Sequence, residues 1–223
     1  VEGHVVRRDG SIADDFTGVL YSTLFDSAED VNTRNNTGLG SHQYTAFNKV
    51  LFSGSDSVVN GRFSFTAPVP MDISYSDEQG LLSFFAVDSS FLRSAQGRYE
   101  NFTVGGTAQD VVNDGIGPDI KLYLNDPSFV DGDEVNSTPC LWVELYDENG
   151  INTVGTGVGH DITAMIDNSP HHTYNLNSMF VPEVGDYKRG KIMLPLNRLE
   201  PGEHTLVLRA WDLYNNSSVA KVS

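Results

Sequence analysis

The sequence has few of the residues on which several common kinds of site depend. Its 223 residues include one cysteine, Cys140, and only 14 Lys and Arg against 30 Asp and Glu, a formal net charge of −16. A single cysteine excludes an intramolecular disulfide and a cysteine-based zinc site. The acidic excess repels nucleic-acid phosphates and anionic lipid surfaces, so both are disfavoured as partners. No apolar run reaches the ~20 residues of a membrane-spanning helix.

An initiator methionine and a signal peptide are also missing, and strand-like sequence begins at Val1. We therefore expect a segment cut from a longer precursor. The chain does have ample material for a packed core. It is 39% hydrophobic and carries 12 Phe, 9 Tyr and 2 Trp, which excludes disorder as a description of the whole. At ~100–200 residues per domain, the length allows one large domain or two small ones.

Apolar residues alternate at every second position in many short runs, which is the pattern of half-buried β-strands. The runs are Phe63-Phe65-Ala67, Leu82-Phe84-Ala86, Ile120-Leu122-Leu124, Leu141-Val143-Leu145, Ile192-Leu194-Leu196 and Leu206-Leu208-Ala210. Turn-forming pairs such as Asn60-Gly61 and Asn215-Asn216 separate them. Residues 26–36 are expected to be a loop because their end is rich in Asn, with a short helical turn as the alternative. The pattern predicts an all-β fold and not a parallel α/β sheet.

A domain boundary is expected near residues 112–118, where Gly, Pro, Asn and Asp dominate and a new strand begins at Ile120. The prediction is two consecutive β-sandwich (immunoglobulin-like) domains, residues 1–113 and 114–223, each of the size of about seven strands. At the end of the second domain, Asn215-Asn216 predicts a hairpin turn. Asp212 is expected to accept backbone N–H groups across that turn.

Several segments resemble one family, the gingipain-like (family C25) cysteine peptidase that serves as the sortase of the type IX secretion system in Bacteroidetes. The most specific is the Gly-x-Gly-x-Gly-His-Asp stretch at 155–161. The others are residues 114–120, 122–126 and 147–152, Asp167, Leu176-Asn177, 202–205 and 211–217, with 15–18, 59–63 and 102–106 in the first half.

The resemblance implies that the chain is the C-terminal, non-catalytic β-sandwich region of such a sortase, so we expect no enzyme activity of its own. The intact protein would act at the outer membrane and cell surface. It would remove the C-terminal signal domain of cargo through a thioester on a cysteine of a separate peptidase domain, and join the new terminus to a surface lipopolysaccharide. The implied partners are the upstream peptidase domain, outer-membrane secretion components and secreted cargo, and the implied role is spacing and docking. No catalytic, cofactor-binding or metal-binding residues are assigned, and no cofactor.

Four features of the sequence are candidate functional sites. Cys140 begins a strand among apolar neighbours, so we expect an inert structural thiol. His160 and Asp161 are adjacent, and adjacent strand residues point to opposite faces, so they are expected to be structural. The loop of Asp126, Asp131, Asp133 and Glu134, or a cluster of Asp147, Asp161 and Asp167, could bind calcium, although solvated turn carboxylates are commoner. His171-His172 could bind a metal, but neighbouring histidines rarely chelate one ion together.

The alternative function is an immunoglobulin-like adhesin or carbohydrate-binding module, for which Tyr123, Trp142 and Trp211 would form an aromatic platform. An autonomous hydrolase is a third hypothesis, but the sequence offers no defensible pair of nucleophile and base. Two triplets, at residues 26–28 and 56–58, resemble the O-glycosylation signal of Bacteroidetes envelope proteins. They add weak support for a location in the cell envelope.

Overall fold

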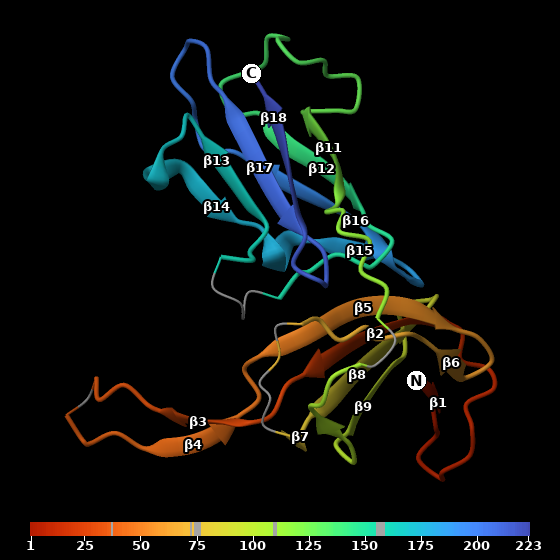
Figure 1. Cartoon of the computed structure of the whole chain (residues 1–223). Coiled ribbons are helices and arrows are strands. Elements are labelled where there is room, and N and C mark those ends of the chain that lie inside the picture. The colour runs from red at the N-terminus through yellow and green to blue at the C-terminus, as the bar shows by residue number, and fades with distance from the viewer. Residues whose placement is uncertain (37, 72, 74–76, 109–110, 155–158) are drawn as a thin grey trace.

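A computed structural model describes residues 1–36, 38–71, 73, 77–108, 111–154 and 159–223 (Figure 1). The described elements are antiparallel β-strands and two single-turn 3-10 helices, so the predicted all-β fold is confirmed. Figure 1 shows the N-terminal and C-terminal parts as two bodies, one below the other. The GTGV part of the glycine-rich motif, residues 155–158, lies outside the described residues.

The first part has one four-stranded sheet in the order β5-β2-β8-β9 and three two-stranded ribbons, β1-β6, β3-β4 and β7-β10. Its strands are β1 (Glu2–His4), β2 (Gly18–Phe25), β3 (Glu29–Asn32), β4 (Gln43–Ala46), β5 (Val50–Val58), β6 (Arg62–Ser64), β7 (Glu78–Gln79), β8 (Leu81–Asp88), β9 (Ser94–Tyr99) and β10 (Thr103–Val104). The sheet β5-β2-β8-β9 is thus the only one with more than two strands in the described residues of this part.

The second part is a sandwich of two four-stranded sheets, β11-β12-β16-β15 and β14-β13-β17-β18. Its elements are β11 (Asp119–Leu124), β12 (Cys140–Tyr146), β13 (Thr163–Ile166), η1 (Pro170–His172), β14 (Thr173–Asn175), η2 (Asn177–Met179), β15 (Val181–Glu183), β16 (Asp186–Pro195), β17 (Leu206–Trp211) and β18 (Ser217–Val222). The edge strands β11 and β18 lie beside each other and close one side of the sandwich.

Each part has its own apolar core, because the alternating strand residues face inward. In the second part, Leu141 and Val143 of β12 meet Leu208 and Ala210 of β17, and all four are fully buried. In the first part the core centres on Leu20, Leu51 and Val58. Tyr187 comes from the second part but packs against the first core. The boundary between residues 113 and 114 remains a proposal, and apart from Tyr187 each cluster's residues lie on one side of it.

Segment 26–36 forms the expected loop only at residues 26–28 and 33–36, and it contains no helical turn. Residues 29–32 form β3, which pairs with β4 in an antiparallel ribbon. In Figure 1 this ribbon projects from the body as an arm. No residue of its two strands belongs to the apolar core, so no buried alternating pattern marked them in the sequence. Besides the main-chain ladder, the side chains of Gln43 and Thr45 donate hydrogen bonds to the Asp30 carboxylate, and composition reveals neither kind of contact.

Two of the predicted turns are confirmed. Asn60 and Gly61 both have positive φ angles, 51° and 70°, as a tight hairpin turn between β5 and β6 requires. At the other hairpin Asn215 has φ 65°, and the Oδ1 atom of Asp212 accepts N–H bonds from Tyr214 and Asn216. The side chain of Asp212 thus takes the predicted role in the β17–β18 connection.

The linker before β11 is held tightly against the second sandwich. A Cβ atom at Gly117 would lie 2.4 Å from the carbonyl carbon of Ser217, at the start of β18. Backbone cannot retreat as a flexible side chain can, so only glycine fits there. The linker and β18 are thus packed backbone to backbone at Gly117.

Replacing Gly117 with Ala should therefore lower the free energy of unfolding by ~1–3 kcal/mol, since the methyl group forces the linker away from β18. Gly97→Ala is the matched control, because its Cβ would meet only the Phe84 ring at 3.9 Å. Urea denaturation followed by circular dichroism, which reports the strands of both parts, gives both values. Equal stability of the two variants would contradict the packing described here.

Candidate functional site

Backbone and side-chain hydrogen bonds gather where the two parts meet. The N–H of Gly185 donates to the carbonyl of Ser55 at 2.7 Å, and the N–H of Met71 donates to the carbonyl of Leu213 at 3.0 Å. These two hydrogen bonds join backbone of the first part to backbone of the second. Asp56 lies at this contact, and burial raises the pKa of its carboxyl group. The surface of β5 is thus covered by the turn between β15 and β16.

Side-chain hydrogen bonds hold the linker on the opposite side of the contact. The Nδ2 group of Asn216 donates to Oδ1 of Asn113 at 2.7 Å, and that of Asn149 donates to Oδ1 of Asp114 at 3.0 Å. The same two acceptor atoms also take N–H bonds from Gly115 and Ile116. We call these four residues, Asn113, Asp114, Asn149 and Asn216, the linker clamp. They fix the linker to two turns that are far apart in the sequence.

Two buried carboxylates lie next to the clamp. Asp147 is 5% exposed and Asp212 is fully buried. Burial is the main reason why the pKa of Asp147 rises to about 6, the hydrogen bond from the Asn149 N–H opposes the rise, and the charges of Asp212 and Asp114 add to it. Asp147 is therefore harder to ionise in the folded protein than in the unfolded chain, although it is mainly ionised at pH 7.

The sign of the pH dependence follows from that pKa. Between its usual value of 3.8 and about 6, the folded protein binds the proton of Asp147 more tightly than the unfolded chain does. Its contribution to stability is fully present below pH ~4 and is lost as pH rises through about 6.

Asp147→Asn should thus raise the free energy of unfolding at pH 8 by ~1–3 kcal/mol and change it little at pH 4. The amide oxygen can still accept the Asn149 N–H, so geometry is kept. Urea denaturation between pH 4 and 8 measures this. Asp126→Asn is the control, because its hydrogen bonds with Ser128 lower the pKa of Asp126 and no gain at pH 8 is expected. A loss of stability at pH 8 in Asp147→Asn would count against the assignment.

Cys140 begins β12, as expected, but it is half-buried and not buried. Its Sγ atom lies 3.7 Å from the carbonyl oxygen of Leu141, and its backbone N–H donates to Oδ1 of Asn125. Among the described residues no base hydrogen-bonds the thiol. A cysteine nucleophile needs such a partner to form its thiolate.

His160 and Asp161 precede β13 in irregular backbone rather than sitting within a strand. The ring of His160 packs on Trp211, with centroids 4.5 Å apart. Asp161 accepts a 2.6 Å bond from the side chain of Asn177, whose Oδ1 in turn accepts the N–H of Ile162. The two side chains thus serve different contacts, and Asp161 fixes the start of β13 through Asn177.

The acidic candidates are spread over separate turns. Asp126, Asp131 and Asp133 accept backbone N–H groups from Ser128, Ser223 and Val130. Asp167 holds both the ring of His204, at 2.7 Å, and the N–H of Thr205. Within the described ranges, no three His, Cys, Asp or Glu side chains come together as a metal site requires. Asp147, Asp161, His171 and His172 are therefore not part of such a group.

The three candidate platform aromatics do not share a surface. Tyr123 and Trp142 are neighbours across the outer face of the β11-β12-β16 sheet, with the exposed Met193 beside them. Trp211 belongs to the other sheet, where it contacts His160 and Arg209. The two possible glycosylation triplets also differ, because Ser27 is buried while Ser57 is exposed on β5.

The sequence-based interpretation missed the linker clamp. Its members lie in segments that were recognised singly, as a linker, an Asp-Glu-Asn-Gly turn and an Asn-Asn turn. The available signal was the number of Asn and Asp side chains at consecutive turns of one domain. The spacing of these residues along the sequence does not predict that the turns contact one another.

The fold and the junction define a region of two all-β sandwich domains with a clamped linker. No protein-family model and no curated protein matches the chain significantly. Among solved structures, the chain is similar to the protein in the "crystal structure of dimeric latent PorU from Porphyromonas gingivalis". The identity is 32% and the TM-score 0.52 over 99% of this chain and 21% of that chain. The chain thus spans about a fifth of that protein's length, and it is a PorU-related region.

No helix in the described part of the chain has the length and apolar character needed to cross a membrane.

Proposed function

We propose that this chain is a non-catalytic accessory region of a type IX secretion sortase in the cell envelope, where it acts as spacer and docking modules. The observation that carries the proposal is the extent of the similarity to PorU, 32% identity over 99% of this chain. The family resemblance of the sequence motifs, at residues 147–152 and 211–217 among others, agrees with it. The similarity includes both domains and the linker between them, so the pair is the related unit.

The junction explains how such a region serves as a spacer. The Gly185–Ser55 and Met71–Leu213 backbone bonds join the two domains, while the clamp hydrogen bonds and the Gly117 contact hold the linker on the second domain. A restrained pair of sandwiches holds the elements at its two ends at a set separation, which a flexible tether does not. Partners of the region would be an upstream peptidase domain of the same protein, outer-membrane secretion components and secreted cargo.

The spacer role predicts that loosening the clamp affects cargo but not chemistry. In source cells, Asn149→Ala with Asn216→Ala in the full gene removes both clamp hydrogen bonds. We expect several-fold slower removal of the cargo's C-terminal signal, measured by immunoblot, with unchanged hydrolysis of a small peptide by the purified protein. Asn101→Ala, at an exposed position outside the junction, is the control.

Unchanged cargo processing in the clamp variant, with the separation of the domains shown to be altered by small-angle scattering, would overturn the spacer role. In-frame deletion of residues 114–223 is the second test. Normal processing in its absence would overturn docking as well. Loss of peptide hydrolysis in either variant would place these domains within the catalytic unit, against the proposal.

A carbohydrate-binding function is the second candidate, favoured by the row formed by Tyr123, Trp142 and Met193 on an outer sheet face. Flat aromatic surfaces of this kind stack on sugar rings. A glycan array probed with the chain and with Trp142→Ala, with and without calcium, tests it. A signal abolished by the substitution would support this function, and a blank array would exclude it.

A further inference from the structure

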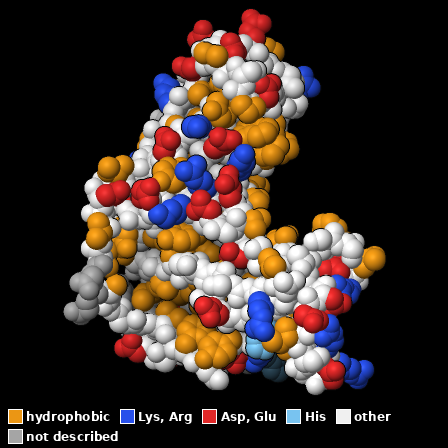
Figure 2. Space-filling view, turned by 90° about the vertical axis from the view of Figure 1, so that its right-hand side faces the viewer, with side chains coloured by type: hydrophobic (Ala, Val, Ile, Leu, Met, Phe, Trp, Pro, Cys, Tyr) orange, Lys and Arg blue, Asp and Glu red, His pale blue; other side chains and the backbone are white. Residues whose placement is uncertain are grey.

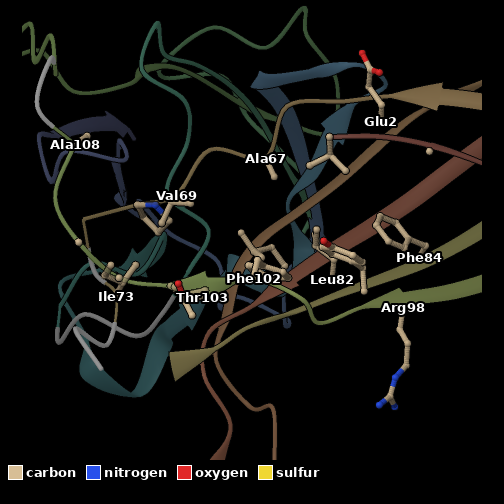
Figure 3. A pocket seen from close by; sticks show the side chains of 18 of the residues that line it. Glu2, Ala67, Val69, Ile73, Leu82, Phe84, Arg98, Phe102, Thr103 and Ala108 are labelled. Atoms are coloured by element: carbon tan, nitrogen blue, oxygen red, sulfur yellow. The ribbon is translucent and has the colours of Figure 1, made fainter. Parts of the chain in front are cut away.

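An apolar hollow is lined mainly by residues of the first domain, with Tyr214 of the second domain also in its lining. It has a volume of about 1190 Å³. Its floor is formed by Leu24 of β2, Leu82 and Phe84 of β8, and the end of β9. Leu24 and Leu82 are buried at the base of this floor, and Phe84 is half-buried. Figure 3 shows Leu82, Phe84 and Phe102 gathered at the middle of the hollow, while Glu2 and Arg98 point away from them. We call it the open groove.

β1 forms one wall of the open groove and has a free edge. Among the described strands it pairs only with β6. Val1 and Phe65 exchange two hydrogen bonds, and the N–H of Val5 donates to Gly61, so residues 1, 3 and 5 use their peptide groups toward β6. In an antiparallel ladder these groups alternate in direction. The N–H and C=O groups of Glu2 and His4 therefore point away from β6.

The two faces of β1 have different surroundings. A Cβ at Gly3 would lie 2.3 Å from the Cζ atom of Phe63, so the inner face of β1 meets the aromatic cluster of Phe63, Phe65 and Phe84. Glu2 and His4 then face outward, because adjacent strand residues alternate. A strand laid beside β1 would place every second side chain on the apolar floor and the others beside Glu2 and His4.

The charges at the rim of the open groove indicate which side chains are favoured at the outward-facing positions of an added strand. Arg98 is neutralised by an ion pair with Glu100 at 2.6 Å, whereas Glu2 forms no ion pair with a described residue. The groove thus has an uncompensated carboxylate, and the whole chain has a net charge of −16. A basic side chain opposite Glu2 is favoured on both grounds.

We propose that the open groove binds an extended polypeptide segment by strand addition to the free edge of β1, and that this segment has apolar residues at alternate positions with Lys or Arg between them. Main-chain bonds to Glu2 and His4 supply the pairing, and the floor around Leu82 and Phe84 selects the apolar residues. The proposal stands apart from the type IX assignment, because it uses only the groove's own residues.

The test uses the whole 223-residue chain and a fluorescein-labelled heptapeptide, Lys-Val-Lys-Val-Lys-Val-Lys, blocked at its carboxyl end. Directly paired residues share a face, so its Lys residues would exchange main-chain bonds with Glu2 and His4. N-methylation at the Lys nitrogens should weaken binding at least tenfold in fluorescence anisotropy. N-methylation at the Val nitrogens is the matched control, with less than a threefold effect. Peptide binding should also slow amide hydrogen exchange at Glu2 and His4.

Substitution in the protein gives an independent measure that keeps the fold. Glu2→Lys should weaken binding of the heptapeptide about fivefold and improve binding of its Glu-Val counterpart. Glu203→Lys makes the same charge change at an exposed site in the second domain and should have less effect.

Four results would overturn the proposal. One is absence of binding up to ~1 mM peptide, and another is equal binding of the two N-methylated peptides. A third is slow exchange at Glu2 and His4 before peptide is added, which would show that a second copy or another part of the chain already fills the groove. The fourth is protection confined to β9.

Discussion

This structure depends on hydrogen bonds that turn N–H groups donate to the oxygens of short carboxylate and amide side chains. A β-sandwich satisfies its strands through their ladders, but its turns leave N–H groups without partners. Asp212, Asp147 and Asp114 each accept such groups at the end of the second sandwich nearest the first. The price of this arrangement is two carboxylates held almost out of water, one of them with a pKa raised to about 6. Because the linker clamp is made from the same turns, the position of the linker on the second sandwich depends on these side chains.

The parts of the fold that could be predicted from the sequence were those with buried alternating strands. The patterns at residues 141–145 and 206–210 lie in β12 and β17, whose inward residues form the second core. Turns with a conformational requirement, such as Asn60-Gly61, were also predicted correctly. The arm at β3 and β4 was not, since its side chains are largely exposed and carry no periodic signal. Likewise the expected strand through Phe65 and Ala67 ends at Ser64.

Contacts between distant turns could not be predicted from one sequence. The linker clamp joins Asn113 and Asp114 to Asn149 and Asn216, and only the three-dimensional arrangement brings them together. Conversely, residues that the sequence suggested as one site lie apart in the structure. Asp147, Asp161 and Asp167 were considered as one cluster, yet each has different partners at a different turn. The similarity to PorU then supplies what residue chemistry alone did not, a relation for the whole two-domain unit.

The β3–β4 arm has a consequence of a different kind. Neither strand contributes to the apolar core, and Leu39 and Tyr44 are exposed along it. Its length is therefore thermodynamically uncoupled from the rest of the domain, since added or removed residues change no buried contact and only a small loop-closure entropy. Evolution can adjust how far this projection reaches from the body without disturbing either core. The arm is thus the place where related chains are free to diverge in length and in what they touch.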